Sequence, residues 1–343
     1  MLSDRVESHW LAAFAEVISL CRPTAGEVVC LLAESQSRSI NLELAELACL
    51  LAGLRPFRCV LPTPAGTASV PLRSTGASRA LQGHPAALAA IKASPLVLDM
   101  TLEGLMHAPE TKDILAAGCR VMVVSNEHPE ALARLVPLPG DDAPVKAAVK
   151  RCRCSSAMHV TSAAGTDLHV DMVGAVTAGV WGWTDRPGTL AHWPGGVVVS
   201  FPQAGTVRGR LVLDTGDVNL TFKRYLQSPV VLTLEDDHVV AIEGEGTDAA
   251  LMRRYLSAFD RNAYAVSHVG WGMNPRARYE ALSMYGQRDT NGTELRCVAG
   301  NFLFSTGANE FAGRYTDGHF DIPVFNTTIA LDGEVVVRDG VVI

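Results

Sequence analysis

The sequence predicts a chain of two parts, an N-terminal α/β domain with a parallel sheet and a C-terminal, β-rich α+β domain. Three observations lead to this prediction. The 343 residues exceed what one core usually supports, because cores tend to split beyond about 250 to 300 residues. Short apolar runs alternate with helix-like segments up to a Gly-, Pro- and charge-rich stretch at 141–156, and short strands with Gly, Asp and Asn turns follow it. We therefore expect domains at 1–150 and 151–343.

The first domain owes its class to the order of its elements. Alternation of this kind implies a parallel sheet wrapped by helices. In such open sheets ligands collect at the carboxyl ends of strands, so Leu105 and His107, which follow the third strand, are placed to line a cleft. The alternative for them is a plain surface loop. The expected strands are 27–34, 58–62, 96–100 and 120–125, and the expected helices are 41–53, 85–93 and 110–117.

The second domain is built mainly from strands bounded by turn residues. One helix is clear, at 248–258, and residues 235–237 form a hairpin turn. Asp-Gly pairs at 332–333 and 339–340 mark two further turns near the end of the chain. The expected strands are 168–173, 195–201, 207–214, 218–225, 229–234, 238–244, 326–331, 335–338 and 341–343.

Composition and missing motifs exclude several functions. A formal net charge of −7 gives no basic surface for a phosphate backbone, so nucleic acid is not expected as a partner. No apolar run approaches a membrane span and the N-terminal residues do not resemble a secretion signal, which indicates a cytoplasmic protein. No Gly-x-Gly-x-x-Gly or phosphate-loop motif follows a predicted strand, which excludes NAD and ATP as expected ligands.

The chemistry is therefore expected from scattered residues, above all in the second domain. His319 and Asp321 are two positions apart, so on a strand both side chains point to one face and can hold one ion. The alternative for His319 is a structural histidine that is hydrogen-bonded near the end of a strand. His268 lies beside glycines that permit tight turns, and it is a further candidate ligand. The alternative for it is a buried core histidine. His159, His169 and Asp171 form a second candidate cluster, otherwise structural, with the last two again on one strand face.

The segments around His268, 300–309 and 317–321 resemble the metal-binding half of the thermophilic metallo-aminopeptidase family. Three departures from its pattern stand out. Val197 occupies the place of a glutamate in the family's Pro-x-Gly-Glu-Val segment. His268 replaces a bridging glutamate before a Gly-x-Gly-x-Asn-Pro turn, and Leu303 replaces a ligand histidine. Two close metal ions need such carboxylates to offset their repulsion, so we expect a single metal.

The surviving set, His268, His319 and Asp321, has the composition of the two-histidine, one-carboxylate triad of non-haem Fe(II) oxygenases, with positions left for substrate and O₂. We therefore expect Fe(II) and a C-terminal metal-binding domain. Zinc hydrolysis by an aminopeptidase-like enzyme remains the alternative.

The same departures resemble the family of 2,5-dihydroxypyridine 5,6-dioxygenases. This resemblance implies an extradiol-like enzyme of nicotinate or nicotine degradation that opens a small aromatic substrate with O₂ to N-formylmaleamic acid. The aminopeptidase relatives form homo-oligomers, which is the expectation here too. We assign acid/base roles to His107 and His192, which can titrate near neutral pH. Substrate contacts are expected from Leu105, Arg296 and Ser305, and a structural ion pair is the alternative for Arg296.

Overall fold

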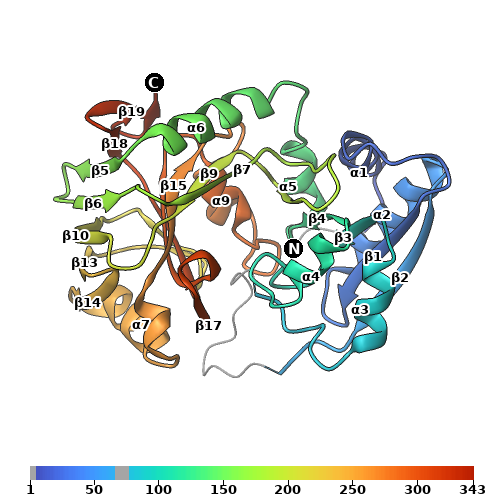
Figure 1. Ribbon diagram of the computed structural model, residues 1–343, viewed down its shortest axis with the longest axis horizontal. Coiled ribbons are helices and arrows are strands. Elements are labelled where there is room, and N and C mark those ends of the chain that lie inside the picture. The colour runs from blue at the N-terminus through green and yellow to red at the C-terminus, as the bar shows by residue number, and fades with distance from the viewer. Residues whose placement is uncertain (1–4, 66–76) are drawn as a thin grey trace.

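The computed structural model describes residues 5–65 and 77–343 and has two halves that pack side by side (Figure 1). The first half contains a five-stranded, all-parallel sheet in the order β2-β1-β3-β4-β8. Its strands are β1 (Val28–Glu34), β2 (Arg55–Leu61), β3 (Leu96–Asp99), β4 (Arg120–Val124) and β8 (Leu190–Trp193), and its helices are α1 (Ser8–Leu20), α2 (Ser39–Leu51), α3 (Pro85–Lys92), α4 (Thr111–Ala116) and α5 (Pro129–Arg134). The predicted parallel sheet is confirmed.

Both faces of this sheet are covered by helices, which explains its apolar strands. In β1, Leu31 belongs to the core shared with α1 and α2, whereas its neighbour Leu32 belongs to the core shared with α3 and α4. Strands buried on both faces are expected to be continuously apolar. The fifth strand, β8, comes from beyond residue 150, so the chain returns to the first sheet after that position, and the division into 1–150 and 151–343 stays a prediction.

The second half contains two antiparallel sheets. The five-stranded sheet, in the order β17-β16-β15-β9-β7, carries the residues of interest here. It consists of β7 (Val176–Val180), β9 (Val197–Phe201), β15 (Val266–Gly272), β16 (Phe302–Asn309) and β17 (Arg314–Val324). The eight-stranded sheet runs β14-β13-β10-β6-β5-β18-β19-β20, made of β5 (Ala157–Ser162), β6 (Asp167–Asp171), β10 (Val207–Leu213), β13 (Val230–Glu235), β14 (His238–Glu243), β18 (Thr327–Leu331), β19 (Glu334–Arg338) and β20 (Val341–Val342).

The remaining elements are short, apart from two helices. The predicted helix at 248–258 is α7 (Gly246–Leu256), and α6 (Asp142–Cys154) packs on β7 and β9. The others are η1 (Arg261–Tyr264), α8 (Ala281–Met284), α9 (Thr293–Cys297) and η2 (Glu310–Ala312).

One predicted strand, 218–225, is wrong. The segment forms two short strands, β11 (Val218–Asn219) and β12 (Arg224–Tyr225), which pair with each other. The Asn219 side chain accepts a hydrogen bond from the Phe222 amide, and Lys223 has a φ of 53°. An asparagine that bonds the backbone ahead of it favours a turn over an extended strand.

Candidate active site

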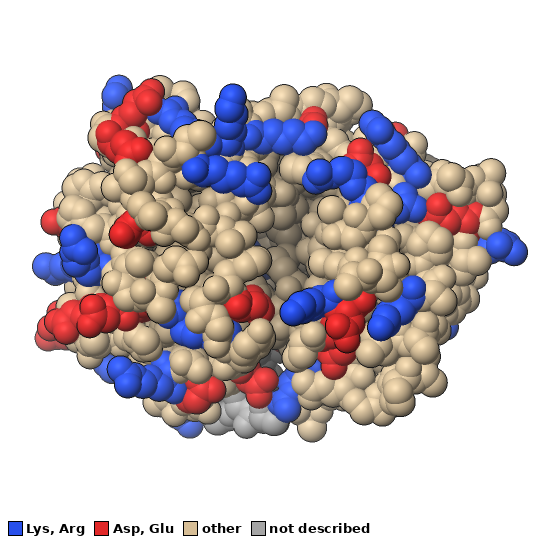
Figure 2. All heavy atoms as spheres, viewed as in Figure 1, with Lys and Arg blue, Asp and Glu red and all other residues tan. Residues whose placement is uncertain are grey.

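A pocket lies where the two halves meet, and a groove is visible there in the space-filling view (Figure 2). One side of it comes from the carboxyl ends of β3, β4 and β8, through residues 101–104, 106–107, Ser125 and His192. The other side comes from β9, β15, β16 and β17 and from the segment that leads into α9. The pocket therefore lies at the carboxyl edge of the parallel sheet, where a ligand was expected.

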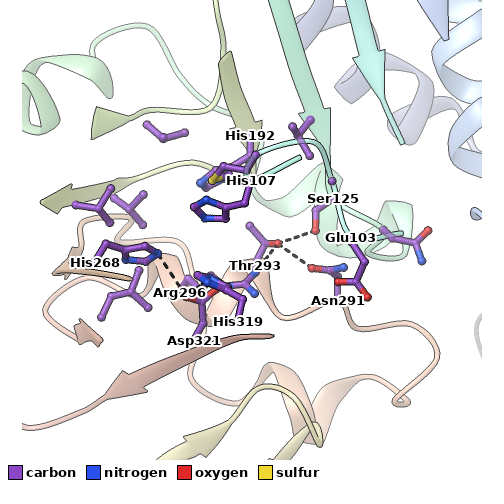
Figure 3. Close-up of a pocket in the computed structure, with 18 of the residues that line it drawn as sticks. Glu103, His107, Ser125, His192, His268, Asn291, Thr293, Arg296, His319 and Asp321 are labelled. Carbon is purple, nitrogen blue, oxygen red and sulfur yellow. Dashed lines mark hydrogen bonds and ion pairs between the residues drawn. The ribbon is translucent and has the colours of Figure 1, made fainter. Parts of the chain in front are cut away.

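His268, His319 and Asp321 converge in this pocket (Figure 3). His268 lies on β15, and the other two lie on β17, separated from β15 by β16. The Oδ1 atom of Asp321 lies 3.1 Å from Nε2 of His319 and 3.6 Å from Nε2 of His268. His319 and Asp321 share one strand face, as the two-residue spacing predicts. Their role as metal ligands stays a prediction.

The electrostatics of the cluster favour neutral imidazoles beside an ionised carboxylate. Burial lowers the pKa of His268 to about 3 and lowers that of His319 as well. For Asp321, burial acts to raise the pKa, but the charge of Arg296 and the hydrogen bond with His319 outweigh burial and hold the pKa well below its usual range. A neutral imidazole and a carboxylate are the protonation states that bind metal ions.

Arg296 and Ser305 hold Asp321 in place. The Nε atom of Arg296 lies 2.5 Å from Oδ2 of Asp321, and the Ser305 hydroxyl donates to Oδ1. Arg296 also lines the pocket, whereas Ser305 is fully buried beneath it. Arg296 and Ser305 were predicted to contact substrate. In the structure, both contact the carboxylate of Asp321.

The two histidines predicted to act as acid or base also reach the pocket. His107 contributes to a group with His268 and His319 in which the candidate ligand atoms lie within 4.8 Å of one another. His192 places Nδ1 2.5 Å from the Pro194 carbonyl oxygen. Burial lowers the pKa of His192 to about 4, so the expectation that this ring titrates near neutral pH is wrong. The neutral ring carries its proton on Nδ1, which donates to Pro194, and its Nε2 retains a lone pair.

Leu105 is not part of the pocket wall, so its predicted substrate contact is wrong. Its side chain is fully buried in the core that β3 shares with α3 and α4, and its amide donates to the buried Asp99. Met106 and His107 line the pocket in its place. Within residues 101–107, Leu105 is thus the one residue that faces the core and does not line the pocket.

A polar wall that the sequence did not reveal is formed by Ser125, Asn291 and Thr293. The Thr293 hydroxyl donates to Oδ1 of Asn291 at 3.0 Å and accepts from Nη1 of Arg296 at 3.2 Å. It also lies 2.8 Å from Oγ of Ser125. Because its only proton goes to Asn291, Ser125 is the donor in that pair, which leaves the Ser125 oxygen with acceptor capacity at the pocket.

Val197 and Leu303 belong to an apolar wall on the other side of the pocket, together with Val180, Val199 and Phe201. Both occupy positions where the aminopeptidase pattern has metal ligands. With these positions apolar, this side of the pocket offers no ligand for a second metal ion and can contact an apolar surface.

The second candidate cluster lies on the exposed face of β5 and β6 and does not line the pocket. His159 and His169 are paired across the two strands, and both direct Nε2 toward Oδ1 of Asp167, at 2.7 and 3.2 Å. Asp171, predicted as their partner, instead accepts from the Val173 amide. The two rings stack with an interplanar angle of 11°, and together with Asp167 they place three possible ligand atoms within 4.8 Å of one another on this exposed face.

The fold and the pocket together define an enzyme-like α/β protein with a buried histidine and carboxylate site. The fold resembles that of the aminopeptidase AmpT from Thermus thermophilus, with a TM-score of 0.61 and 15% identity over 97% of this chain and 99% of that one. Among residues 5–65 and 77–343, no helix is long and apolar enough to cross a membrane.

The chain belongs to the family of 2,5-dihydroxypyridine 5,6-dioxygenases, whose family model matches residues 9–343. A 2,5-dihydroxypyridine 5,6-dioxygenase from Pseudomonas putida is 38% identical over 267 residues, 77% of this chain and 75% of that protein. A solved structure of a 2,5-dihydroxypyridine dioxygenase from Pseudomonas putida matches with a TM-score of 0.92 and 32% identity, over 100% of this chain and 98% of that one.

Proposed function

We propose that this protein is a non-haem, Fe(II)-dependent dioxygenase that opens the ring of 2,5-dihydroxypyridine with O₂ to give N-formylmaleamic acid, in the breakdown of nicotinate or nicotine. Membership of the family supports the activity. The observation that carries it is the convergence of His268, His319 and Asp321 in a pocket with one apolar and one polar wall.

The residues fit a single divalent metal ion. The Nδ1 atoms of His268 and His319 are buried and have no hydrogen-bond partner among the described residues, which leaves each ring with an uncommitted nitrogen. Two neutral imidazoles and one carboxylate match the donor set of non-haem Fe(II) oxygenases. When bound, Fe(II) would supply open coordination positions for the ring oxygen and for O₂, and it would conduct electrons from the ring, which is oxidised, to O₂.

The protein's own residues bind and orient the substrate. Val197, Leu303 and Phe201 can contact the ring face, and Ser125 can accept a hydrogen bond from its polar edge. Arg296 provides positive charge beside Asp321, which stabilises a deprotonated ring oxygen. His107 and His192 can accept and return the proton of the ring hydroxyl, since both line the pocket and His192 keeps a lone pair on Nε2.

The decisive experiment is to load the purified protein with Fe(II) under anaerobic conditions and to add 2,5-dihydroxypyridine and O₂. We expect O₂ uptake, with loss of both activity and bound iron in His268→Ala, His319→Ala and Asp321→Ala. Ring opening in anaerobic buffer would reject the proposal. Two bound metal ions per chain, with peptidase activity, would instead support the aminopeptidase-like alternative.

We further propose that the protein is a cytoplasmic homo-oligomer, and self-association is what its resemblance to the aminopeptidase family implies. Light scattering of the purified chain measures its mass, and a mass of 36.5 kDa, that of one chain, would contradict the oligomer.

A further inference from the structure

Glu310 is a residue that the sequence analysis did not single out, yet it contacts one of the two proposed proton acceptors. It begins η2, the turn between β16 and β17 in the second half, whereas His107 follows β3 in the first. Its Oε1 atom lies 3.2 Å from Nδ1 of His107. The His107 side chain is only 4% exposed and that of Glu310 31%. The contact therefore crosses from one half to the other at the edge of the pocket.

An ionised carboxylate decides which nitrogen of this imidazole carries the proton. Burial acts to raise the pKa of Glu310, but the hydrogen bond with His107 outweighs it and the pKa is lowered. A carboxylate can only accept a hydrogen bond, so Nδ1 of His107 carries the proton and donates it. In the neutral ring the lone pair then lies on Nε2. The opposite tautomer would set two acceptors against each other.

The imidazole ring of His107 lies inside the pocket, close to the two candidate ligand histidines. The ring centroid of His107 lies 4.8 Å from that of His319 and 6.3 Å from that of His268, to which it is nearly parallel at 14°. Figure 3 shows the ring at the centre of the pocket, between His268 and the polar wall. A substrate seated in the pocket is therefore within reach of this ring.

We propose that Glu310 is a positioning residue that holds His107 in the Nδ1–H tautomer, so that Nε2 receives the hydroxyl proton of the substrate. The inference rests on the proposed function for the identity of the substrate. In the transfer, the O–H bond of the substrate breaks and an N–H bond forms at Nε2. The imidazolium keeps its Nδ1–H bond to the Glu310 carboxylate, which balances its positive charge until the proton is returned to the product side.

The first test measures the tautomer directly. The full-length, metal-free protein is labelled with ¹⁵N-histidine, and the ring signals of His107 are assigned by their absence from His107→Gln. In the wild type we expect the pyrrole-type signal from Nδ1 and the pyridine-type signal from Nε2. In Glu310→Ala we expect the two tautomers to mix. Glu243→Gln, an exposed glutamate on β14, serves as the control and is expected to leave the spectrum unchanged.

The second test separates positioning from a structural role. With Fe(II) bound, Glu310→Ala is expected to lower kcat about 10- to 100-fold with little change in KM or iron content, and Glu310→Asp to restore part of it. A wild-type His107 with its proton on Nε2 would overturn the inference, as would an unchanged tautomer in Glu310→Ala. A wild type that takes up no O₂ would reject the proposed function, whereas the tautomer measurement would still decide the role of Glu310.

Discussion

We expect single side chains on the polar wall to distinguish a nitrogen heterocycle from a ring of carbon atoms. The Ser125 hydroxyl gives its proton to Thr293, so it faces the pocket as an acceptor. A dihydroxypyridine offers a donor on its nitrogen edge in the pyridone form, whereas hydroquinone, which has the same placement of two hydroxyls, has only a C–H there. Ser125 is thus placed to recognise the ring nitrogen.

Replacing Ser125 by alanine should therefore weaken recognition of the heterocycle. We expect the KM for 2,5-dihydroxypyridine to rise about tenfold, equivalent to about 1.4 kcal/mol, the upper part of the range for one hydrogen bond. The inhibition constant of hydroquinone should barely change. Ser200→Ala removes a hydroxyl that bonds Thr177 and does not line the pocket, and it is expected to alter neither constant. Equal losses for both rings in Ser125→Ala would contradict this role.

Asp217 should give the protein a pH-dependent stability. Burial raises its pKa to about 7 from an ordinary value of 3.8, although the amides of Phe325 and Asp214 donate to it. The folded state therefore holds a proton that the unfolded chain releases. The stability from this group is fully present below about pH 4 and is lost as the pH rises through 7.

The Asp217→Asn variant tests this sign, because asparagine cannot release a proton. We expect the wild type to be the more stable protein at pH 4 and its advantage to shrink toward pH 8, by up to about 1.4 kcal/mol per pH unit. Urea unfolding of both proteins across this range measures the difference. An advantage that grows with pH would show that Asp217 is ionised in the folded state.

Site residues could be predicted from the sequence where a pattern among neighbouring residues marked them. His319 and Asp321 were found because a two-residue spacing on a strand fixes their relative direction, and His268 because of a family pattern. Leu105 faces the core and not the pocket, since the direction of a loop side chain is set by what its backbone packs against. Glu310 and Ser125 carry no signal in their own segments, because their partners lie 203 and 168 positions away.

At the scale of elements, the central strand β15 places His268 between its two neighbours. It pairs with β9 on one edge and β16 on the other, and all seven of its residues are buried. Gly270 permits this packing, because a Cβ there would lie less than 3 Å from the carbonyl of Val198 on β9. The backbones of the two strands thus approach each other where no side chain fits.

Gly270→Ala should consequently destabilise the second half. We expect a loss of at least about 2 kcal/mol in the free energy of unfolding, since the clash is with backbone that cannot rotate away. Gly286→Ala is the matched control, because a Cβ there meets only Asp289 at 3.6 Å. Urea unfolding curves with equal midpoints for the two variants would show that β9 and β15 can separate at little cost.

Element prediction succeeded where a rule acts over a few residues. The turns at Asp332-Gly333 and Asp339-Gly340 have positive φ at both residues, as the predicted hairpins require. The helix α1 was not predicted, although Trp10, Phe14, Val17 and Ile18 repeat at helical spacing and are buried. In contrast, α8 and α9 have four and five residues, too few for a period to show, and tertiary contacts determine them.

At the scale of the whole molecule, a carboxylate from the first half fixes a wall of the pocket that belongs to the second. Glu127 follows β4 and is buried. Its two oxygens accept from the amides of Asn291, Gly292 and Thr293, at 2.6, 2.7 and 3.1 Å. These residues lead into α9, which carries Arg296. The placement of Arg296 beside Asp321 thus depends on contact between the halves.

Glu127→Gln should loosen this connection without altering any side chain that lines the pocket. One carboxylate oxygen becomes an NH₂ group that faces an amide donor, so at least one buried amide loses its acceptor, at a cost of about 1 to 3 kcal/mol. Since the loss falls on residues 291–293, we expect faster amide hydrogen exchange in this segment and a higher KM. Glu130→Gln, three positions along and bonded to Trp10, should leave exchange at 291–293 unchanged. Equal protection of this segment in wild type and Glu127→Gln would mean that other contacts hold the halves together and that the polar wall is positioned by the second half alone.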